Sequence, residues 1–474
     1  MPVTRIRGLA LLLAGSALLP ACASVPDLGA RPQPRAAASF AATETLRNGD
    51  GAWPTVDWWG GYRDAQLDGL MREALAGAPT LEQAAARLRI AQGLAQQAGA
   101  ALVPTVDLSG SAGFVQQSEN NGVPAVFVPD GWRDTAKIGL GFSLDLDLWG
   151  RNRANLAAVR SDADAAQFEL AEARLALTTG IASAYAEFGR LHAQHGVLAA
   201  TLANREKTAR LVAGRTAAGL DTHVALRQAQ SRAATAQAEL AATDEALALS
   251  RNALAALIGS GPDRGLEIAA PSVAELAPRA LPANAAIDLV GRRPDVAAAR
   301  ASVEAEANRI KVARAAFYPN ISLSGLIGLQ SLGLASLLDG GSAFGNVGPA
   351  VSLPIFHGGA LSGQYRGARG RYDEAVARYD GLVAEALRQV ADALASRNYL
   401  TQRAEHSRQA LAAAEQALAL ALQRYRSGLS TYLDVLSTED GVLQGRRAVA
   451  DLQARAFTLD VAMVRALGGG FATT

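Results

Sequence analysis

Residues 135–148 read TAKIGLGFSLDLDL, and this stretch decides the fold. Apolar residues stand at every second position from Ala136 to Leu148, and threonine, lysine, glycine, serine and aspartate stand between them. Successive side chains of a strand point to opposite faces, so this alternation predicts a long β-strand with one apolar and one polar face. Residues 105–114 alternate in the same way. The two stretches predict a β-hairpin.

The same pattern returns in the second half of the chain, which is a tandem duplication. PTVDLSG at 104–110 aligns with PNISLSG at 319–325, and GLDT at 219–222 aligns with GLST at 428–431. Self-similarity of this kind indicates two copies of one structural unit. A second hairpin of alternating residues is therefore predicted within 319–357, which makes four strands of about 12 to 15 residues each.

Each hairpin is followed by a long helical pattern. From about 150 to 213, and again from about 360 to 426, the chain has no proline and its apolar residues recur at helical spacing. A helix of such length is a rod of roughly 96 Å at ~1.5 Å per residue. The chain then returns in heptads, from about 222 to 258 in the first half, which predicts left-handed coiled-coil packing. A shorter helix over 80–102 is expected to stack end to end with the returning helix.

Four strands cannot close a membrane barrel, because the smallest closed barrels have about eight, and an open sheet edge is not tolerated in lipid. Several chains must therefore contribute strands. Two copies would give eight strands and three would give twelve, and the residues do not choose between them. A soluble β-sandwich with a separate coiled coil is the alternative, but it leaves the glycine-rich polar face, the export signal and the duplication without a common cause.

The first residues form an export signal. Arg5 and Arg7 precede an apolar run, Leu9 to Leu19, that is too short to span a bilayer. LPAC at 19–22 resembles a bacterial lipobox, which predicts an S-diacylglycerol and an N-acyl group on Cys22. An ordinary signal peptide cut near residue 23 is the alternative. Ala23, rather than aspartate, follows the cysteine, so we expect an anchor in the outer membrane.

Composition excludes several other classes of function. Cys22 is the only cysteine, so disulfides and thiolate metal clusters are excluded, and a formal net charge of +1 gives no reason to expect nucleic acid as a partner. His192 and His195 lie three apart on a helix, but no nearby carboxylate completes a metal site. No catalytic motif is present. We therefore expect no enzyme activity, no metal and no cofactor.

Several motifs together resemble the TolC/OprM-like outer membrane factors, in particular the NodT-type lipoproteins of efflux systems. They are the lipobox cysteine, WW at 58–59, RRPDV at 292–296, FYP at 317–319 and ALGGGF at 466–471. The resemblance covers essentially the whole mature chain, although family members typically end in Trp where this chain has Phe471. It implies an α+β membrane protein and a homotrimer: a 12-stranded transmembrane β-barrel, four strands from each chain, continued by a periplasmic α-helical coiled-coil barrel.

The resemblance also implies a function and partners. The chain would be the passive exit duct of a tripartite efflux system for drugs or other small molecules. A periplasmic adaptor and an inner-membrane pump of the RND type would deliver them, and outer membrane lipid would surround the barrel. An exit duct for type I secretion or for metal efflux remains an alternative. From another class, a trimeric coiled-coil surface or adhesive lipoprotein explains the heptads but neither the two-faced hairpins nor the duplication.

These readings divide the chain into five parts. Residues 1–21 are the signal peptide and 22–56 a lipid-anchored linker. The first repeat covers 57–258, with its hairpin at 104–149 and its long helices at 150–258. A linker at 259–285 joins the second repeat, 286–471, with its hairpin at 319–357 and its long helices at 360–467.

Candidate functional residues lie in the turns between the long helices and on the polar strand face. By the resemblance, the turns dock the adaptor, although glycine there is also the usual way to end a helix. Tyr425 and Asp434 match gate positions of the family, where an aspartate ring attracts cations; a solvated aspartate on a helix surface is the alternative. The lumen candidates could equally be hydrated wall residues. The predicted docking residues are Gly219, Leu220, Gly428 and Leu429, and the lumen candidates are Lys137, Asp145 and Asp147.

Overall fold

A computed structural model describes residues 24–46, 49, 51–271, 281–283 and 285–472. The chain divides into two compact units, each built from segments of both sequence halves. The first unit contains residues 88–166 and 299–379, and the second contains residues 167–298 and 380–472 together with residues 35–87. The strands belong to the first unit and the turns between the long helices to the second.

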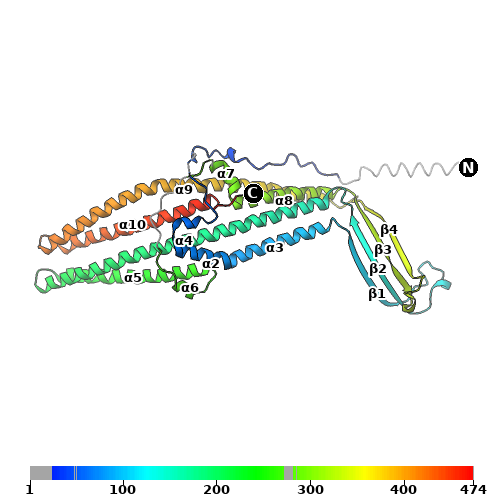
Figure 1. The fold of residues 1–474 in the computed structure, drawn as a ribbon, viewed down its shortest axis with the longest axis horizontal. Helices are drawn as coiled ribbons and strands as arrows, with labels where there is room; N and C mark the ends of the chain where they lie inside the picture. Colours follow the sequence, from blue (N-terminus) through cyan, green and yellow to red (C-terminus); the bar gives the residue numbers. More distant parts are fainter. Residues whose placement is uncertain (1–23, 47–48, 50, 272–280, 284, 473–474) are drawn as a thin grey trace. The chain divides into compact units, whose positions relative to one another are not determined.

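The first unit holds one antiparallel sheet of four strands in the order β1-β2-β3-β4 (Figure 1). The two predicted hairpins are confirmed. In addition β2 pairs with β3, with Lys137 opposite Gln330, so the duplicated hairpins share one sheet. The bounds are β1 Thr105–Val115, β2 Arg133–Asp145, β3 Asn320–Leu332 and β4 Ala343–Ser352.

Two of the four strands are shorter than expected. Strands β1 and β4 have 11 and 10 residues rather than about 12 to 15, whereas β2 and β3 have 13 each. The alternation in β2 continues to Leu148, but the strand ends at Asp145 because the backbone turns at Asp147, which has a φ of 47°. Ten or more residues still suffice for a tilted membrane strand, which needs about 9 to 11.

The helices repeat in length as the sequence repeats in pattern. The long helices α4 and α9 have 67 residues each, the returning helices α5 and α10 have 35 each, and α3 and α8 have 22 each. Their bounds are α4 Arg151–Ala217, α9 Ala360–Arg426, α5 His223–Leu257, α10 Tyr432–Ala466, α3 Pro79–Ala100 and α8 Pro294–Ala315. The predicted long helices are confirmed, and α4 runs four residues beyond its expected end at 213.

Three short helices were not predicted. Helix α2, Ala65–Gly77, is capped by Asp64, whose side chain accepts hydrogen bonds from the backbone N–H groups of Gln66 and Leu67. Helix α7 spans Ala285–Arg292, and α6, Pro262–Leu266, lies inside the segment that we expected to be a plain linker. Helices α6 and α7, with five and eight residues, are too short to show a clear helical period in a sequence. The 13 residues of α2 do carry such a period, in Leu67, Leu70, Met71 and Ala74, but it was missed.

The main core of the second unit surrounds α2. Its aromatic residues are buried and meet edge to face, with the ring centroids of Tyr62 and Phe457 4.5 Å apart. Tyr185 on α4 donates a hydrogen bond from its hydroxyl to Asp64, so the cap of α2 is tied to the long helix. The buried aromatic residues of this core are Trp58, Trp59, Tyr62, Tyr185, Phe188 and Phe457.

Candidate functional site

The two faces of the sheet differ in chemistry as predicted. The register places Ser111 and Gln330 beside Lys137, so lysine, serine, glutamine and glycine share one face. The Lys137 ammonium lies 5.0 Å from the ring centroid of Phe344 on that face. The opposite face exposes large apolar side chains, namely Val106, Leu108, Phe114, Ile138, Leu140, Ile327, Val347 and Val351. Such an area of exposed apolar surface marks contact with lipid or with another protein.

Asp147, one of the lumen candidates, has a local role at the start of α4. Its side chain is buried, at 8% exposure, and accepts hydrogen bonds from the backbone N–H groups of Asn152 and Arg153 and from the Arg153 guanidinium. Burial raises the pKa of the Asp147 carboxyl, but these hydrogen bonds outweigh it and the net pKa is lowered. Asp147 therefore stabilises the start of α4, where unpaired N–H groups favour an anion.

Asp145 stands at the last position of β2, beside this cap. Its Oδ2 pairs with the Arg151 guanidinium at 3.1 Å, and its Oδ1 accepts a hydrogen bond from the backbone N–H of residue 147. The register keeps Asp145 opposite Ser322, on the polar face of the sheet. Asp145 and Lys137 thus share a face, while Asp147 belongs to the turn beyond it.

The turns between the long helices close in the same way in both halves. Gly219 and Gly428 adopt left-handed φ values of 71° and 75°, which glycine reaches without strain. The N–H of Leu220 donates to the carbonyl of Arg215, and that of Leu429 to Arg424, each at 2.8 Å. These are Schellman closures. The two leucines are 65% and 68% exposed, so the glycines end helices and the leucines present apolar surface.

Tyr425, a predicted gate residue, is buried and joins the two helical hairpins. Its hydroxyl donates a hydrogen bond to the Asp221 carboxylate in the turn of the first hairpin. The Arg215 guanidinium lies 4.7 Å from the Tyr425 ring centroid, and its Nε is 3.6 Å from Asp221 Oδ2. Burial raises the pKa of Tyr425, and the hydrogen bond to the Asp221 carboxylate raises it further, so the hydroxyl remains protonated and can donate. We call Tyr425, Asp221 and Arg215 the turn latch.

Sequence reasoning missed two of the three residues of the turn latch. Asp221 and Arg215 lie in or before the first turn, whereas the prediction concerned only the second hairpin. The duplication gives no hint, because the offset that brings Gly219 onto Gly428 places Asp221 on Ser430 and Tyr425 on Thr216. The turn latch therefore joins residues that have no counterpart of the same type in the other repeat.

Asp434, the other predicted gate residue, is exposed and occupies the third position of α10. Its carboxylate accepts a hydrogen bond from the Thr431 backbone N–H at 3.0 Å, and Thr431 caps the same helix in a capping box. The structure therefore shows a local role in starting α10. The cation-attracting role stays a prediction.

A second polar cluster, unpredicted from the sequence, lies deeper between α4, α5 and α10. Arg205, 4% exposed, pairs with Asp440 at 3.0 Å, and Arg232 pairs with the same aspartate at 3.3 Å. Glu439 accepts a hydrogen bond from the Thr208 hydroxyl, while its Oε2 is buried with no hydrogen-bond partner. Burial raises the pKa of Glu439. Removal of Asp440 would leave the buried Arg205 guanidinium without its ion-pair partner.

Two of the recognised motifs meet in the second unit. Arg293 is buried, forms two hydrogen bonds with Asp295 and donates a third to the carbonyl of Ala466. A Cβ on Gly468 would lie 1.8 Å from the carbonyl oxygen of Arg292. The RRPDV segment and the closing ALGGGF segment therefore pack directly against each other.

Other predictions lie outside what the structure describes. Cys22 and the signal peptide fall among the residues that are not described. Within the described ranges, no three His, Cys, Asp or Glu side chains are grouped so that they could hold a metal ion. In the same ranges, every helix is too short or too polar to cross a membrane.

Comparison with known proteins gives consistent matches along the chain. The family model described as "Outer membrane efflux protein" matches residues 70–260 and 288–469. The fusaric acid resistance protein FusA of Burkholderia cepacia is 35% identical over 367 residues, which cover 74% of this chain and 67% of the relative. The multidrug resistance outer membrane protein MdtP of Shigella flexneri is 29% identical over 365 residues, which cover 76% and 75%.

A solved structure is similar over nearly its whole length. The crystal structure of the outer membrane protein VceC from Vibrio cholerae has a TM-score of 0.84 and 45% sequence identity, and the match covers 88% of this chain and 100% of that one. The two stretches matched by the family model each contain one hairpin and one pair of long helices.

Proposed function

The chain belongs to the outer membrane efflux protein family and is an outer-membrane efflux channel; on this premise we propose that three copies form one channel for small organic molecules. The names of the relatives, which concern fusaric acid and multidrug resistance, support this class of cargo. The energy for export would come from an inner-membrane pump of the RND type, linked to the channel by a periplasmic adaptor.

The observation that carries the proposal is the four-stranded sheet with its exposed apolar face. Strands β1 and β4 each pair on one side only within the described chain, and an unpaired edge is costly in lipid. Copies of the chain can satisfy one another's edges, β4 of one copy against β1 of the next. Three copies supply twelve strands and put serine, lysine and glycine around a water-filled lumen.

Lipid attachment at Cys22 belongs to the proposal as well. The lipobox at 19–22 and the signal peptide over 1–21 support it. An S-diacylglycerol and an N-acyl chain together provide the two or more apolar anchors that stable attachment requires. We therefore place the mature N-terminus at the outer membrane and the long helices in the periplasm.

In this proposal the turns at Gly219-Leu220 and Gly428-Leu429 dock the adaptor, and the turn latch holds the periplasmic end closed. The exposed leucines supply apolar contact, and the buried hydrogen bond of Tyr425 links the hairpins that must separate for opening. Displacement of the turns by a bound partner is one way to break that bond. Docking and gating would thus be coupled through Asp221, which lies in the turn itself.

Two measurements test the proposal. Detergent-purified protein should have the mass of three chains by light scattering and should produce discrete conductance steps in planar bilayers. A monomeric mass without conductance would exclude the channel assembly.

For docking, Gly428→Trp should leave the trimer intact but abolish drug efflux in cells. Gly122→Trp, in the loop between β1 and β2, is the matched control, because Gly122 has a φ of 77° and open space around it. Unimpaired efflux by Gly428→Trp would exclude docking at this turn.

A further inference from the structure

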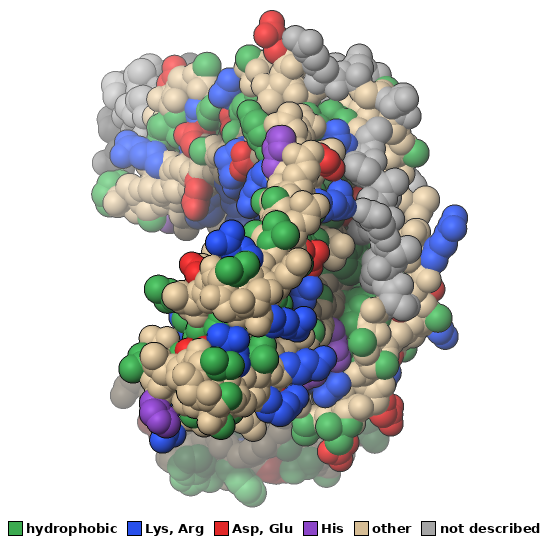
Figure 2. Space-filling view, turned by 90° about the vertical axis from the view of Figure 1, so that its left-hand side faces the viewer, with side chains coloured by type: hydrophobic (Ala, Val, Ile, Leu, Met, Phe, Trp, Pro, Cys, Tyr) green, Lys and Arg blue, Asp and Glu red, His purple; other side chains and the backbone are tan. Residues whose placement is uncertain are grey.

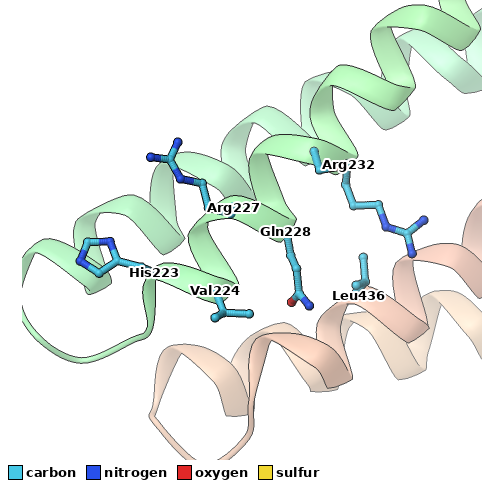
Figure 3. Close-up of a pocket in the computed structure, with 7 residues that line it drawn as sticks. His223, Val224, Arg227, Gln228, Arg232 and Leu436 are labelled. Carbon is cyan, nitrogen blue, oxygen red and sulfur yellow. The ribbon is translucent and has the colours of Figure 1, made fainter.

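A groove of about 580 Å³ lies beside the first turn, between the beginnings of α5 and α10. Val224 and Gln228 point between the two helices, while His223 and Arg227 extend outward from the α5 wall (Figure 3). Leu436 of α10, which is buried, forms the apolar floor. The remaining lining residues are Ser231 and Arg232.

The α5 wall of the groove carries only positive or neutral side chains. Between Asp221 and Glu239 the sequence contains Arg227, Arg232 and His223 but no aspartate or glutamate. Space-filling shows Lys and Arg side chains gathered on the lower part of the face that carries the turns (Figure 2). Arg232 already pairs with Asp440, whereas in the described chain Arg227 has one polar partner, the neutral side chain of Gln230. The charge of Arg227 is therefore available to a partner.

The second hairpin has the opposite net charge at the corresponding place. Residues 431–447 contain Asp434, Glu439 and Asp440 against Arg446 and Arg447, a net charge of −1, whereas residues 222–238 contain two arginines and no acidic residue, a net charge of +2. In the alignment of the two turns, Arg227 corresponds to Leu436. The turns share Gly-Leu, but the helices that follow them have diverged in charge.

We propose that the groove binds an acidic α-helical segment of the periplasmic partner, with its carboxylates at Arg227 and its apolar side chains against Val224 and Leu436. This inference rests on the proposed docking at the turns. It adds that the two turns differ: the first binds a negatively charged segment and the second does not. Val224 is 66% exposed and Leu220, in the adjacent turn, is 65% exposed, so apolar surface surrounds the mouth of the groove. An amphipathic helix with an acidic stripe matches both features.

The direct test uses purified full-length protein and two labelled peptides. Both are amphipathic helices of about 25 residues, long enough to be helical in water, and they differ only in carrying Glu or Lys along the polar face. By fluorescence anisotropy the Glu peptide should bind more tightly as salt is lowered, and the Lys peptide should not bind. Arg227→Glu should weaken the Glu peptide by about five- to tenfold, and Arg227→Gln by less.

Arg210→Glu is the control, because Arg210 is also an exposed arginine, lies near the end of α4 and is outside the groove. Equal binding of both peptides, or an equal loss in Arg210→Glu and Arg227→Glu, would overturn the proposal. If instead Arg227→Glu breaks the trimer, a second copy of the chain covers the groove and the proposal is wrong.

Drug efflux in cells separates this inference from the docking proposal on which it rests. Loss of efflux in Gly428→Trp together with normal efflux in Arg227→Glu would leave docking standing and reject the acidic partner. Normal efflux in both variants would reject docking itself. Loss in both, with normal efflux in Arg210→Glu, is the result we expect.

Discussion

At the scale of single residues, the hydroxyl of Tyr425 is the clearest link between the two helical hairpins. It donates to a carboxylate from the other hairpin while its ring packs against Tyr432 and Arg215. A hydrogen bond to a charged group contributes about 1.5 to 3 kcal/mol. One atom can therefore shift the balance between a joined and a separated pair of hairpins by about ten- to a hundredfold.

Tyr425→Phe should raise the open probability of single channels in planar bilayers, because it removes the donor to Asp221 and keeps the ring. Tyr62→Phe is the matched control: it removes a Tyr hydroxyl that donates to Asp460 at 2.7 Å in the main core, away from the turns. The latch assignment fails if the two variants behave alike.

Glu439 gives a prediction about pH. Burial raises its pKa, so the folded state disfavours the carboxylate, and this cost is absent below the ordinary pKa of about 4.5 and grows as pH rises through the folded value. Glu439→Gln removes the charge. The variant should therefore unfold at a higher temperature than the parent at pH 7, and the gain should vanish near pH 4.

Glu385→Gln provides a control of opposite sign. Hydrogen bonds from Arg388 and Gln389 lower the pKa of Glu385 to about 2, so its contribution is present above pH 4.5 and is lost as pH falls toward 2. This variant should be the less stable one at pH 7. Circular dichroism measures the unfolding temperatures. If both variants shifted the unfolding temperature at pH 7 in the same direction, the assignment for Glu439 would be contradicted.

Individual roles were the least predictable part of the site. Asp147 alternates with Leu146 and Leu148 like a strand residue, yet its carboxylate caps α4, because the first backbone N–H groups of a helix have no acceptor within the helix. Tyr425 could be proposed from a family pattern, but its partner Asp221 is 204 residues away in sequence and could not. A side chain's partner depends on tertiary contacts that periodicity does not encode.

At the scale of elements, the close contact between β2 and β3 depends on glycine. Gly139 and Gly328 are paired across the two strands. A Cβ on Gly328 would lie 2.1 Å from the carbonyl oxygen of Ile138 and 2.8 Å from the Cα of Gly139. Both neighbours are backbone atoms and cannot rotate away, so any larger residue must push the strands apart.

Gly328→Ala should therefore reduce the yield of assembled channel by about tenfold, because overpacking costs about 1 to 3 kcal/mol. The amount of oligomer that resists detergent on unheated gels measures this yield. Gly348→Ala, in β4 with no atom within 4 Å of its new Cβ, should assemble normally. A normal yield for Gly328→Ala would show that the strands can separate without penalty.

Elements were more predictable than residue roles. Period-two alternation identified both hairpins, and unbroken helical spacing identified α4 and α9, because each pattern continues long enough to exclude the other. The pairing of β2 with β3 could not be predicted, since either hairpin presents two equivalent edges. The short α6 has only five residues, which are too few to show a helical period.

At the scale of the whole molecule, the sheet and the proposed lipid are two separate means of membrane attachment. Cys22→Ser should abolish incorporation of radiolabelled palmitate, because it removes the thiol. It should still permit trimers in the outer membrane if an ordinary signal peptide replaces residues 1–21, because the apolar sheet face remains. Labelling of the variant would exclude Cys22 as the lipidation site.

The pairing of β2 with β3 also has a consequence for timing. Lys137 and Gln330 are neighbours in the sheet, but nearly 200 residues separate them, and contacts between such distant segments form late in folding. During export, the first hairpin reaches the periplasm long before its neighbour strand exists. Until β3 arrives, the edge of β2 that it covers is unpaired, and an unpaired edge is open to pairing with other chains. The first hairpin must therefore be kept from such contacts while the rest of the chain is made.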